Sequence, residues 1–227
     1  MDAIVYDLEF SSNRSRTGEI IEIGAVRLTR DPASGEWLIA DTFSTLVKPR
    51  THLNNDTVQL TGIERTQLAD APTFAEAIDA FRAWVGDRPC YFCTWGPEDR
   101  ILLIERCQEL GLDIGEWFRN HNDLQRQFSE RYSRENGTRF RQIGLRKACE
   151  IVGVAIEGHE HRALDDARTT ARLFLQAQDC FELRTNTPEE LSKYETRVIY
   201  SSGDADTDET ANPFAKLAGL FAPPREH

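Results

Sequence analysis

The sequence lacks the features that define several classes of protein. No apolar run reaches the roughly 18 residues that a membrane helix needs, and the first residues show neither the basic start nor the apolar stretch of a signal peptide. Neither an internal repeat nor a GxxxxGK phosphate-binding loop is visible. We therefore expect a cytoplasmic protein with no membrane segment and no P-loop.

Cysteine is scarce, and its spacing gives little support to a metal or redox site. Cys90 and Cys93 form a CxxC, but neither a second CxxC nor a histidine pair at zinc spacing accompanies it. In a reducing compartment we expect the cysteines to be buried thiols. The alternative is a zinc-binding or redox protein built on them. The five cysteines are Cys90, Cys93, Cys107, Cys149 and Cys180.

Positive charge is also in short supply. Lys and Arg number 27 against 38 Asp and Glu, and the net charge of -11 argues against general coating of nucleic acid. Residues 126–147 are the exception, because this basic tract interleaves cations with Phe128, Tyr132 and Phe140, which predicts phosphate contacts and base stacking. The alternative is a solvated helix and loop. The cations are Arg126, Arg131, Arg134, Arg139, Arg141, Arg146 and Lys147, against Glu130 and Glu135.

The pattern of apolar residues predicts an α/β fold. A chain of 227 residues, 40% hydrophobic and 29% charged, suits one globular domain with an appendage. We expect strands at residues 3–10, 19–28 and 37–47, forming an antiparallel meander, then a strand at 90–94 and an extended piece at 121–124. We expect helices at 73–84, 97–111, 125–132, 145–152 and 163–181. Alternation of this kind predicts a mixed sheet flanked by helices.

The end of the chain differs in character from the rest. Thr187 begins a capping-box pattern, which predicts one more helix. Residues 201–211 are acidic and small, which is typical of disorder, and residues 212–221 form a short apolar segment. We therefore divide the chain into a domain at 1–182 and a helical and disordered tail at 183–227. The apolar segment is a candidate for docking on a protein partner, through Pro213 to Phe221.

Two acids in the first strand are the first candidates for chemistry. Asp7 and Glu9 lie two residues apart, so both project from one face of the strand, while Leu8 and Phe10 project from the other. Acids inside an apolar strand need a partner, and residues 3–10 contain no Lys or Arg, so a divalent cation is a candidate. The alternative is an exposed strand end with solvated acids.

Two helices supply further candidates. At about 100° per residue, Asp99 falls on the inward face of its helix, although an ordinary carboxylate at a helix start is the alternative. In the last helix Asp166 lies at the edge of the apolar arc, whereas Asp165 lies opposite it. His161 precedes the first turn, where an imidazole can reach a site. A surface histidine is the alternative, and His159 is a competitor for the same role.

These residues occur in an order that resembles a known family. Asp7-Leu8-Glu9, then Asp99, then His161-x-Ala163-x-x-Asp166 are similar to the three motifs of the DEDDh (DnaQ-like) 3′–5′ exonucleases. The resemblance covers about residues 1–180, and within the family it is nearest the branch of KapD-like proteins and of exoribonucleases that trim histone messenger and small interfering RNA. Secondary matches are Val47-Lys48-Pro49, Leu60-Thr61-Gly62-Ile63, Ala71-Pro72-Thr73-Phe74 and Gly144-Leu145.

The resemblance implies a fold, a cofactor and a set of roles. It implies an RNase H-like five-stranded mixed sheet, and two Mg²⁺ or Mn²⁺ ions held by Asp7, Glu9, Asp99 and Asp166. His161 would act as the general base, since an unperturbed imidazole titrates near neutral pH. The expected reaction is metal-dependent hydrolysis of nucleic acid from a free 3′ end to nucleoside 5′-monophosphates.

The substrate is less closely defined than the chemistry. We expect Leu8, Phe10 and Ser11 to contact the terminal nucleotide and Arg139 and Arg141 to bind the strand. The stretch after the first motif departs from many members of the family, which bears on substrate preference. The branch favours RNA or short single strands. The alternatives are a DNA-directed proofreading or repair exonuclease and a module that binds nucleic acid without cutting it. The oligomeric state stays open.

Overall fold

The computed structural model describes residues 1–11, 18–51, 53–115, 117–156, 158–187 and 189–190. Met1–Tyr194 forms one compact unit, and a second unit, Glu195–His227, lies outside the described residues. The acidic stretch and the apolar segment expected in the tail lie outside them too, and so does the partner surface expected from Pro213 to Phe221.

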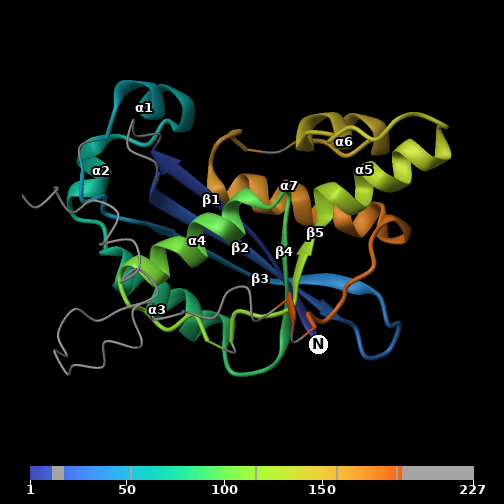
Figure 1. Ribbon diagram of the computed structural model, residues 1–227, viewed down its shortest axis with the longest axis horizontal. Helices are drawn as coiled ribbons and strands as arrows, with labels where there is room; N and C mark the ends of the chain where they lie inside the picture. Colours follow the sequence, from blue (N-terminus) through green and yellow to red (C-terminus); the bar gives the residue numbers. More distant parts are fainter. Residues whose placement is uncertain (12–17, 52, 116, 157, 188, 191–227) are drawn as a thin grey trace, which may run out of the picture. The chain divides into compact units, whose positions relative to one another are not determined.

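A five-stranded mixed sheet of order β3-β2-β1-β4-β5 forms the centre of the fold (Figure 1). The first three strands form the expected antiparallel meander, and β4 and β5 run parallel to β1 on its other side. The apolar start of β1 suits a central position, because Ala3, Ile4 and Val5 are all fully buried. The strands are β1 (Asp2–Ser11), β2 (Glu19–Arg30), β3 (Trp37–Leu46), β4 (Cys90–Thr94) and β5 (His121–Asp123).

Helices cover both faces of this sheet (Figure 1). On one face α3 and α4 pack against β1, with Phe81 and Leu103 buried beside Tyr6. On the other face α7 packs through Ala167 and Phe174, while α5 and α6 join α7 in a separate cluster. The helices are α1 (Asn55–Thr61), α2 (Arg65–Ala69), α3 (Phe74–Val85), α4 (Glu98–Glu109), α5 (Leu124–Glu135), α6 (Leu145–Val152) and α7 (Ala163–Gln176).

The structure corrects the expected helices at two places. The last helix ends at Gln176 and not at residue 181, because Ala177 leaves the helical conformation and a short 3₁₀ turn, Gln178–Cys180, follows. Phe181 still packs on the helix, with its ring 5.4 Å from that of Phe174. Two short helices, α1 and α2, were not predicted, because caps such as the Asn54 side chain define them and not a long apolar period.

Residues beyond 182 remain in contact with the domain. The backbone N of Arg184 donates to Oδ1 of Asn122 at 2.8 Å, and the backbone N of His121 donates to Oδ1 of Asn186 at 2.8 Å, so the chain runs along β5. Thr187 and Glu190 make both hydrogen bonds of the expected capping box. The boundary between 182 and 183 stays a prediction. Among the described residues no helix has the length and apolarity to cross a membrane.

The cysteines are free thiols, and four of the five are buried as expected. Cys180 differs, because it lies half-buried after α7. Burial raises the pKa of Cys90 to about 11 and that of Cys107 to about 12, and raises the pKa of Cys93 still further. Their thiolate forms are therefore disfavoured, which weighs against the redox alternative.

Candidate active site

The acids of β1 lie where this strand loses one of its neighbours. β4 pairs with β1 only from Asp2 to Val5, so the edge of β1 opens beyond that point. Asp7 and Glu9 occupy the open part and line a cavity of about 360 Å³. Glu9 is only 8% exposed. The alternative of solvated acids at an exposed strand end is therefore wrong for Glu9.

The start of α4 fills part of this opening and brings Asp99 to β1. The backbone N of Leu8, which has no partner on β4, donates to Oδ1 of Asp99 at 3.2 Å. Asp99 is 8% exposed and lines the same cavity as Asp7 and Glu9. The inward orientation expected from helical periodicity is confirmed. The hydrogen bond fixes the start of α4 to the central strand across 91 positions of sequence.

The start of α7 brings Asp166 and His161 to the same cavity. Possible ligand atoms of Glu9, His161 and Asp166 all lie within 4.8 Å of one another. The backbone N of His161 donates to Oδ2 of Asp166 at 3.0 Å, and His161 has a φ of 64°, which is uncommon for a residue other than glycine. His161 lines the cavity and is exposed to solvent, whereas His159 does not line it.

Burial and neighbouring carboxylates raise the pKa of all four acids. Burial, followed by the charges of Asp99, Asp166 and Glu9, raises the pKa of Asp7 well above its usual value. Burial and the charges of Asp166 and Glu22 raise the pKa of Glu9 to about 8. Burial raises the pKa of Asp99 to about 7 although the Leu8 hydrogen bond lowers it, and burial also raises that of Asp166. Divalent cations relieve such repulsion, so this all-oxygen set of carboxylates fits Mg²⁺ or Mn²⁺.

A second cavity of about 360 Å³ adjoins the first and shares Asp7, Trp95, His161 and Asp166 with it. We call the two cavities together the catalytic pocket. The second cavity is also lined by Leu145 at the start of α6. The first is lined by Leu60 of α1, which is 56% exposed. The sequence predicts neither α1 nor a substrate role for Leu60. Leu60-Thr61-Gly62-Ile63 is nevertheless one of the secondary matches to the family.

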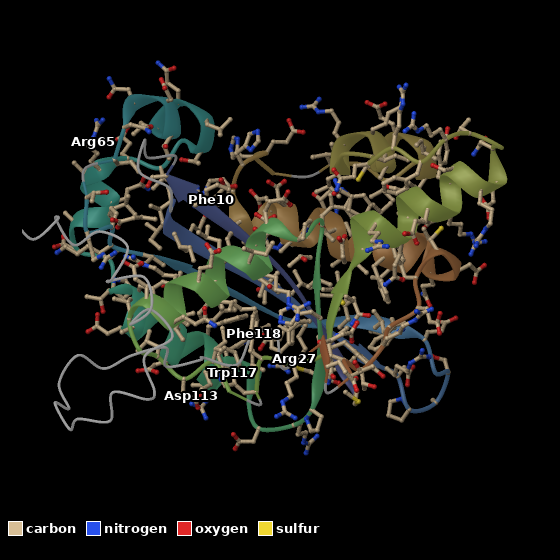
Figure 2. The ribbon with its side chains drawn as sticks, viewed as in Figure 1. Phe10, Arg27, Arg65, Asp113, Trp117 and Phe118 are labelled. Atoms are coloured by element: carbon tan, nitrogen blue, oxygen red, sulfur yellow. The ribbon has the colours of Figure 1, made fainter. Side chains whose placement is uncertain are left out.

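The expected substrate-binding residues separate into three groups. Leu8 and Phe10 line the first cavity, and Phe10 lies near the end of β1 (Figure 2). A β-bulge between Glu9 and Phe10 interrupts the alternation of faces. Ser11 is buried and lines neither cavity; its Oγ accepts from the backbone N of Glu19 at 3.4 Å. Arg139 and Arg141 line a separate hollow of about 690 Å³.

The basic tract is only partly available for binding. Arg126 and Arg131 form ion pairs with Glu130 and Glu135 on their own helix, and Phe128 is only 3% exposed. Stacking of a base on Phe128 is therefore excluded by burial, whereas Phe140 is 48% exposed. Arg146 pairs with Glu160, and Lys147 with Glu150. Within the described part of the chain, neither Arg139 nor Arg141 has an ion pair, and both are exposed.

The sheet order, the flanking helices and the four-carboxylate pocket with its histidine define an RNase H-like exonuclease domain of the DEDDh type. The chain belongs to the exonuclease family: the family model described as RNase_T, Exonuclease, matches residues 4–174. The resemblance inferred from the motifs is thereby confirmed.

Known proteins of two kinds are similar to this chain. ERI1 exoribonuclease 2 of Xenopus laevis is 27% identical over 75% of this chain, which spans 27% of that protein. A PolC-type DNA polymerase III of Clostridium perfringens is 27% identical over 75% of this chain, which spans 11% of that protein. The nuclease domain of 3′hExo, a DEDDh family member bound to rAMP, superposes with a TM-score of 0.67 at 26% identity, over 82% of this chain and 96% of that domain.

Proposed function

We propose that the protein is a metal-dependent 3′–5′ exonuclease that releases nucleoside 5′-monophosphates from a free 3′ end. The observation that carries this proposal is the convergence of Asp7, Glu9, Asp99, Asp166 and His161 on one pocket. These residues come from β1, α4 and the start of α7, and they span about 160 positions of sequence. A remnant site that only binds nucleic acid has no need for the full set, so the non-cleaving alternative is less well supported.

The four carboxylates would hold two Mg²⁺ or Mn²⁺ ions. When bound, such a pair stabilises the attacking and leaving oxygens of a phosphodiester displacement. Asp7 is the candidate for the shared ligand, because the charges of Asp99, Asp166 and Glu9 all act on its carboxyl group. Glu9 lies beside Asp166 and His161, and Asp99, which also lines the pocket, is fixed by the backbone N of Leu8.

His161 is the candidate general base. Its imidazole has a possible ligand atom within 4.8 Å of carboxylate oxygens of both Glu9 and Asp166, and its exposure lets it pass a proton to bulk water. The His161 backbone is fixed by Asp166 and does not depend on the imidazole. We therefore expect His161→Ala to remove the proton acceptor and leave the fold intact.

The test is digestion of a 5′-labelled oligonucleotide by purified protein with Mn²⁺, followed by mass identification of the products. Asp166→Asn is expected to abolish shortening from the 3′ end. Asp165→Asn is the matched control, because Asp165 lies on the same helical turn but lines neither cavity of the catalytic pocket. Equal activity of the wild type and Asp166→Asn would remove the proposal. Products ending in 3′-phosphates would show that the other P–O bond of the phosphodiester is broken. They would contradict the proposed release of nucleoside 5′-monophosphates.

For the substrate we propose RNA or short single strands. An exoribonuclease and a nuclease domain bound to rAMP are among the similar proteins, and they support RNA. Similarity to PolC-type DNA polymerases supports the alternative of a DNA-directed exonuclease. Matched RNA and DNA oligomers of the same sequence, digested side by side, separate the two. Faster removal of deoxynucleotides would favour the DNA alternative.

We propose that the strand leaves the catalytic pocket across the start of α6. Leu145 and Arg146 line the pocket, whereas the next residue, Lys147, lines the hollow that also contains Arg139 and Arg141. Phe10 and Leu60, both exposed at the first cavity, are placed to contact the terminal nucleotide. Arg139 and Arg141 would then bind phosphates further along the strand.

Three further expectations remain proposals. The cytoplasm suits five cysteines that are all free thiols. The partner surface from Pro213 to Phe221 stays a proposal for residues outside the described part of the chain. We propose that the tail from residue 183 is an appendage of the domain. At its start, Arg184 and Asn186 hydrogen-bond to β5.

A further inference from the structure

A buried carboxylate on β2 contacts the segment that carries His161. Glu22 is 1% exposed, and its Oε2 and Oε1 accept hydrogen bonds from Nε and Nη2 of Arg162 at 3.1 and 2.8 Å. Its Oε2 also accepts from the backbone N of Ala163 at 3.0 Å. Glu22 lines neither cavity of the catalytic pocket. Its carboxylate is therefore committed to the start of α7 and does not reach a substrate there.

This contact takes the place of a local helix cap. Arg162 occupies the N-cap position of α7 but makes no capping hydrogen bond with its own side chain. Glu22 satisfies the backbone N of Ala163 instead, from a position 141 residues away in sequence. On the other side of Arg162, Asp166 accepts from the backbone N of His161. The chain is thus held on both sides of Arg162, which keeps His161 at its uncommon positive φ.

Gly24, on the same face of β2, lets α7 lie directly on the strand. A Cβ at Gly24 would lie 2.1 Å from the backbone N of Leu164 and 2.2 Å from the carbonyl carbon of Ala163. In the antiparallel register Glu22 is opposite Glu9, and Gly24 is opposite Asp7. Partners in such a pair project from the same face of the sheet. The residues of β2 that hold α7 are thus beside the residues of β1 that line the pocket.

We propose that Glu22, acting through Arg162 and Ala163, is a positioning residue that fixes His161 and Asp166 relative to Asp7 and Glu9. The proposal rests on the proposed exonuclease function. The competing view is that the pair of Glu22 and Arg162 only stabilises the fold. The two views differ in what they predict for a variant that remains folded, because a displacement of about 1 Å in a catalytic group costs on the order of 100-fold in rate.

Glu22→Gln and Glu19→Gln form a matched pair of variants. Both residues are buried acids of β2, but Glu19 contacts Arg106 and the backbone of Arg50, and within the described part of the chain it makes no hydrogen bond or ion pair with α7. Glu22→Gln retains the size of the side chain and loses its charged, two-point contact with Arg162. We expect its kcat to fall by about 100-fold while KM stays within about threefold. For Glu19→Gln we expect a similar loss of thermal stability and a kcat within about threefold of the wild type.

Binding of Mn²⁺ to the full chain, measured by calorimetry, provides a readout that does not depend on cleavage. We expect Glu22→Gln to weaken Mn²⁺ binding by about tenfold or more, because loss of residues that orient metal ligands lowers metal affinity on this scale. We expect Glu19→Gln to leave Mn²⁺ binding unchanged. Wild-type kcat and Mn²⁺ affinity in folded Glu22→Gln would overturn the proposal, and so would equal losses in both variants.

Two further outcomes are distinguishable. If the wild type cleaves no oligonucleotide, the proposed function fails, while the Mn²⁺ measurement still decides whether Glu22 organises the pocket. If Glu22→Gln does not fold, Arg162→Lys replaces it, because lysine retains the charge but cannot make the paired contact. Arg162→Lys is expected to lower kcat with little change in KM, and an unchanged kcat in that folded variant would overturn the proposal.

Discussion

The catalytic pocket and the basic tract at residues 126–147 hold their charges in opposite ways. The acids of the pocket come from distant parts of the chain and are largely buried, and the charges of the other acids help to raise the pKa of Asp7 and of Glu9. The cations of the basic tract are neighbours in sequence, and Arg126 and Arg131 are paired with glutamates four residues further along α5. Charges that are clustered in sequence are thus largely neutralised locally, whereas charges that converge only in the fold are left facing one another.

This difference indicates which charges can act on a ligand. Pairs four residues apart on an exposed helix contribute only about 0.3 to 0.5 kcal/mol, and they occupy both partners without building a site. Buried carboxylates without cations are unfavourable, and the protein retains them at a cost in stability. We therefore expect substitutions in the pocket to have large effects on activity, and substitutions in the basic tract to have effects that depend on whether the cation is already paired.

The largest effect is expected from Asp7→Asn. Removing this carboxylate from the centre of the pocket should lower kcat by at least about 1,000-fold, because several kcal/mol of metal-based stabilisation are lost. In EDTA the same variant should have a higher Tm than the wild type, because one buried repulsive charge is removed. Kinetics and thermal unfolding measure the two effects. If the Tm of Asp7→Asn in EDTA is lower than that of the wild type, the Asp7 charge does not oppose folding.

Dependence on pH should distinguish the pocket from the rest of the surface. The folded pKa of Glu9 is about 8 against an ordinary 4.5, and that of Asp99 is about 7 against 3.8. A raised carboxyl pKa means that the native state binds more protons, so stability is fully present below the ordinary pKa and is lost as pH rises through the folded value. In EDTA we expect Tm to fall between about pH 5 and pH 8.

Mn²⁺ should reverse this trend, since it binds the ionised carboxylates and raises Tm more at pH 8 than at pH 5. Glu9→Gln is the control, because it removes the group whose pKa is about 8 and should flatten the dependence of Tm on pH in EDTA. The same slope in Glu9→Gln and the wild type would contradict the assignment of the effect to the pocket.

Much of this contrast could be predicted from sequence, because periodicity records which way a side chain points. The spacing of Asp7 and Glu9 and the inward position of Asp99 follow from strand and helix geometry, and the structure places these acids in one cavity. The strands were also predictable, since apolar runs such as that of β1 are long enough to show their type. Their meeting in one pocket was implied by family resemblance and not by local pattern.

What could not be predicted depends on contacts across the sheet. In the sequence, Glu22 cannot be distinguished from any other acid of a strand. The register of the sheet places it opposite Glu9, and the fold brings it into contact with Arg162. Phe128 carries the same signal as Phe140 in the basic tract, but only the packing of α5 shows that one is buried and the other exposed. Leu60 belongs to a seven-residue helix that is too short for an apolar period to reveal.

Phe10→Ala tests the apolar mouth of the pocket, with an effect of intermediate size. Phe10 is 41% exposed and lines the first cavity, so loss of its ring should remove stacking on the terminal base. A base stacked on an aromatic ring contributes about 1 to 3 kcal/mol, so we expect KM to rise by about tenfold or more with kcat less affected. Leu38→Ala is the control, since Leu38 is 47% exposed on β3 and lines no part of the pocket. Equal KM values for the two variants would show that the terminal base does not stack on Phe10.

The smallest effect is expected on binding of the strand by the basic tract. Two double variants test it. Arg139→Gln with Arg141→Gln removes two exposed cations without ion pairs to other described residues, whereas Arg126→Gln with Arg131→Gln removes two that are already paired. Each phosphate contact on a single strand contributes about 0.7 to the slope of log K against log salt. If each of the first two arginines binds one phosphate, their loss should reduce the slope by about 1.4 and weaken binding a few-fold, while the paired variants leave the slope nearly unchanged. Equal slopes in both double variants would show that net charge alone matters, and that the hollow beside α6 does not hold the strand.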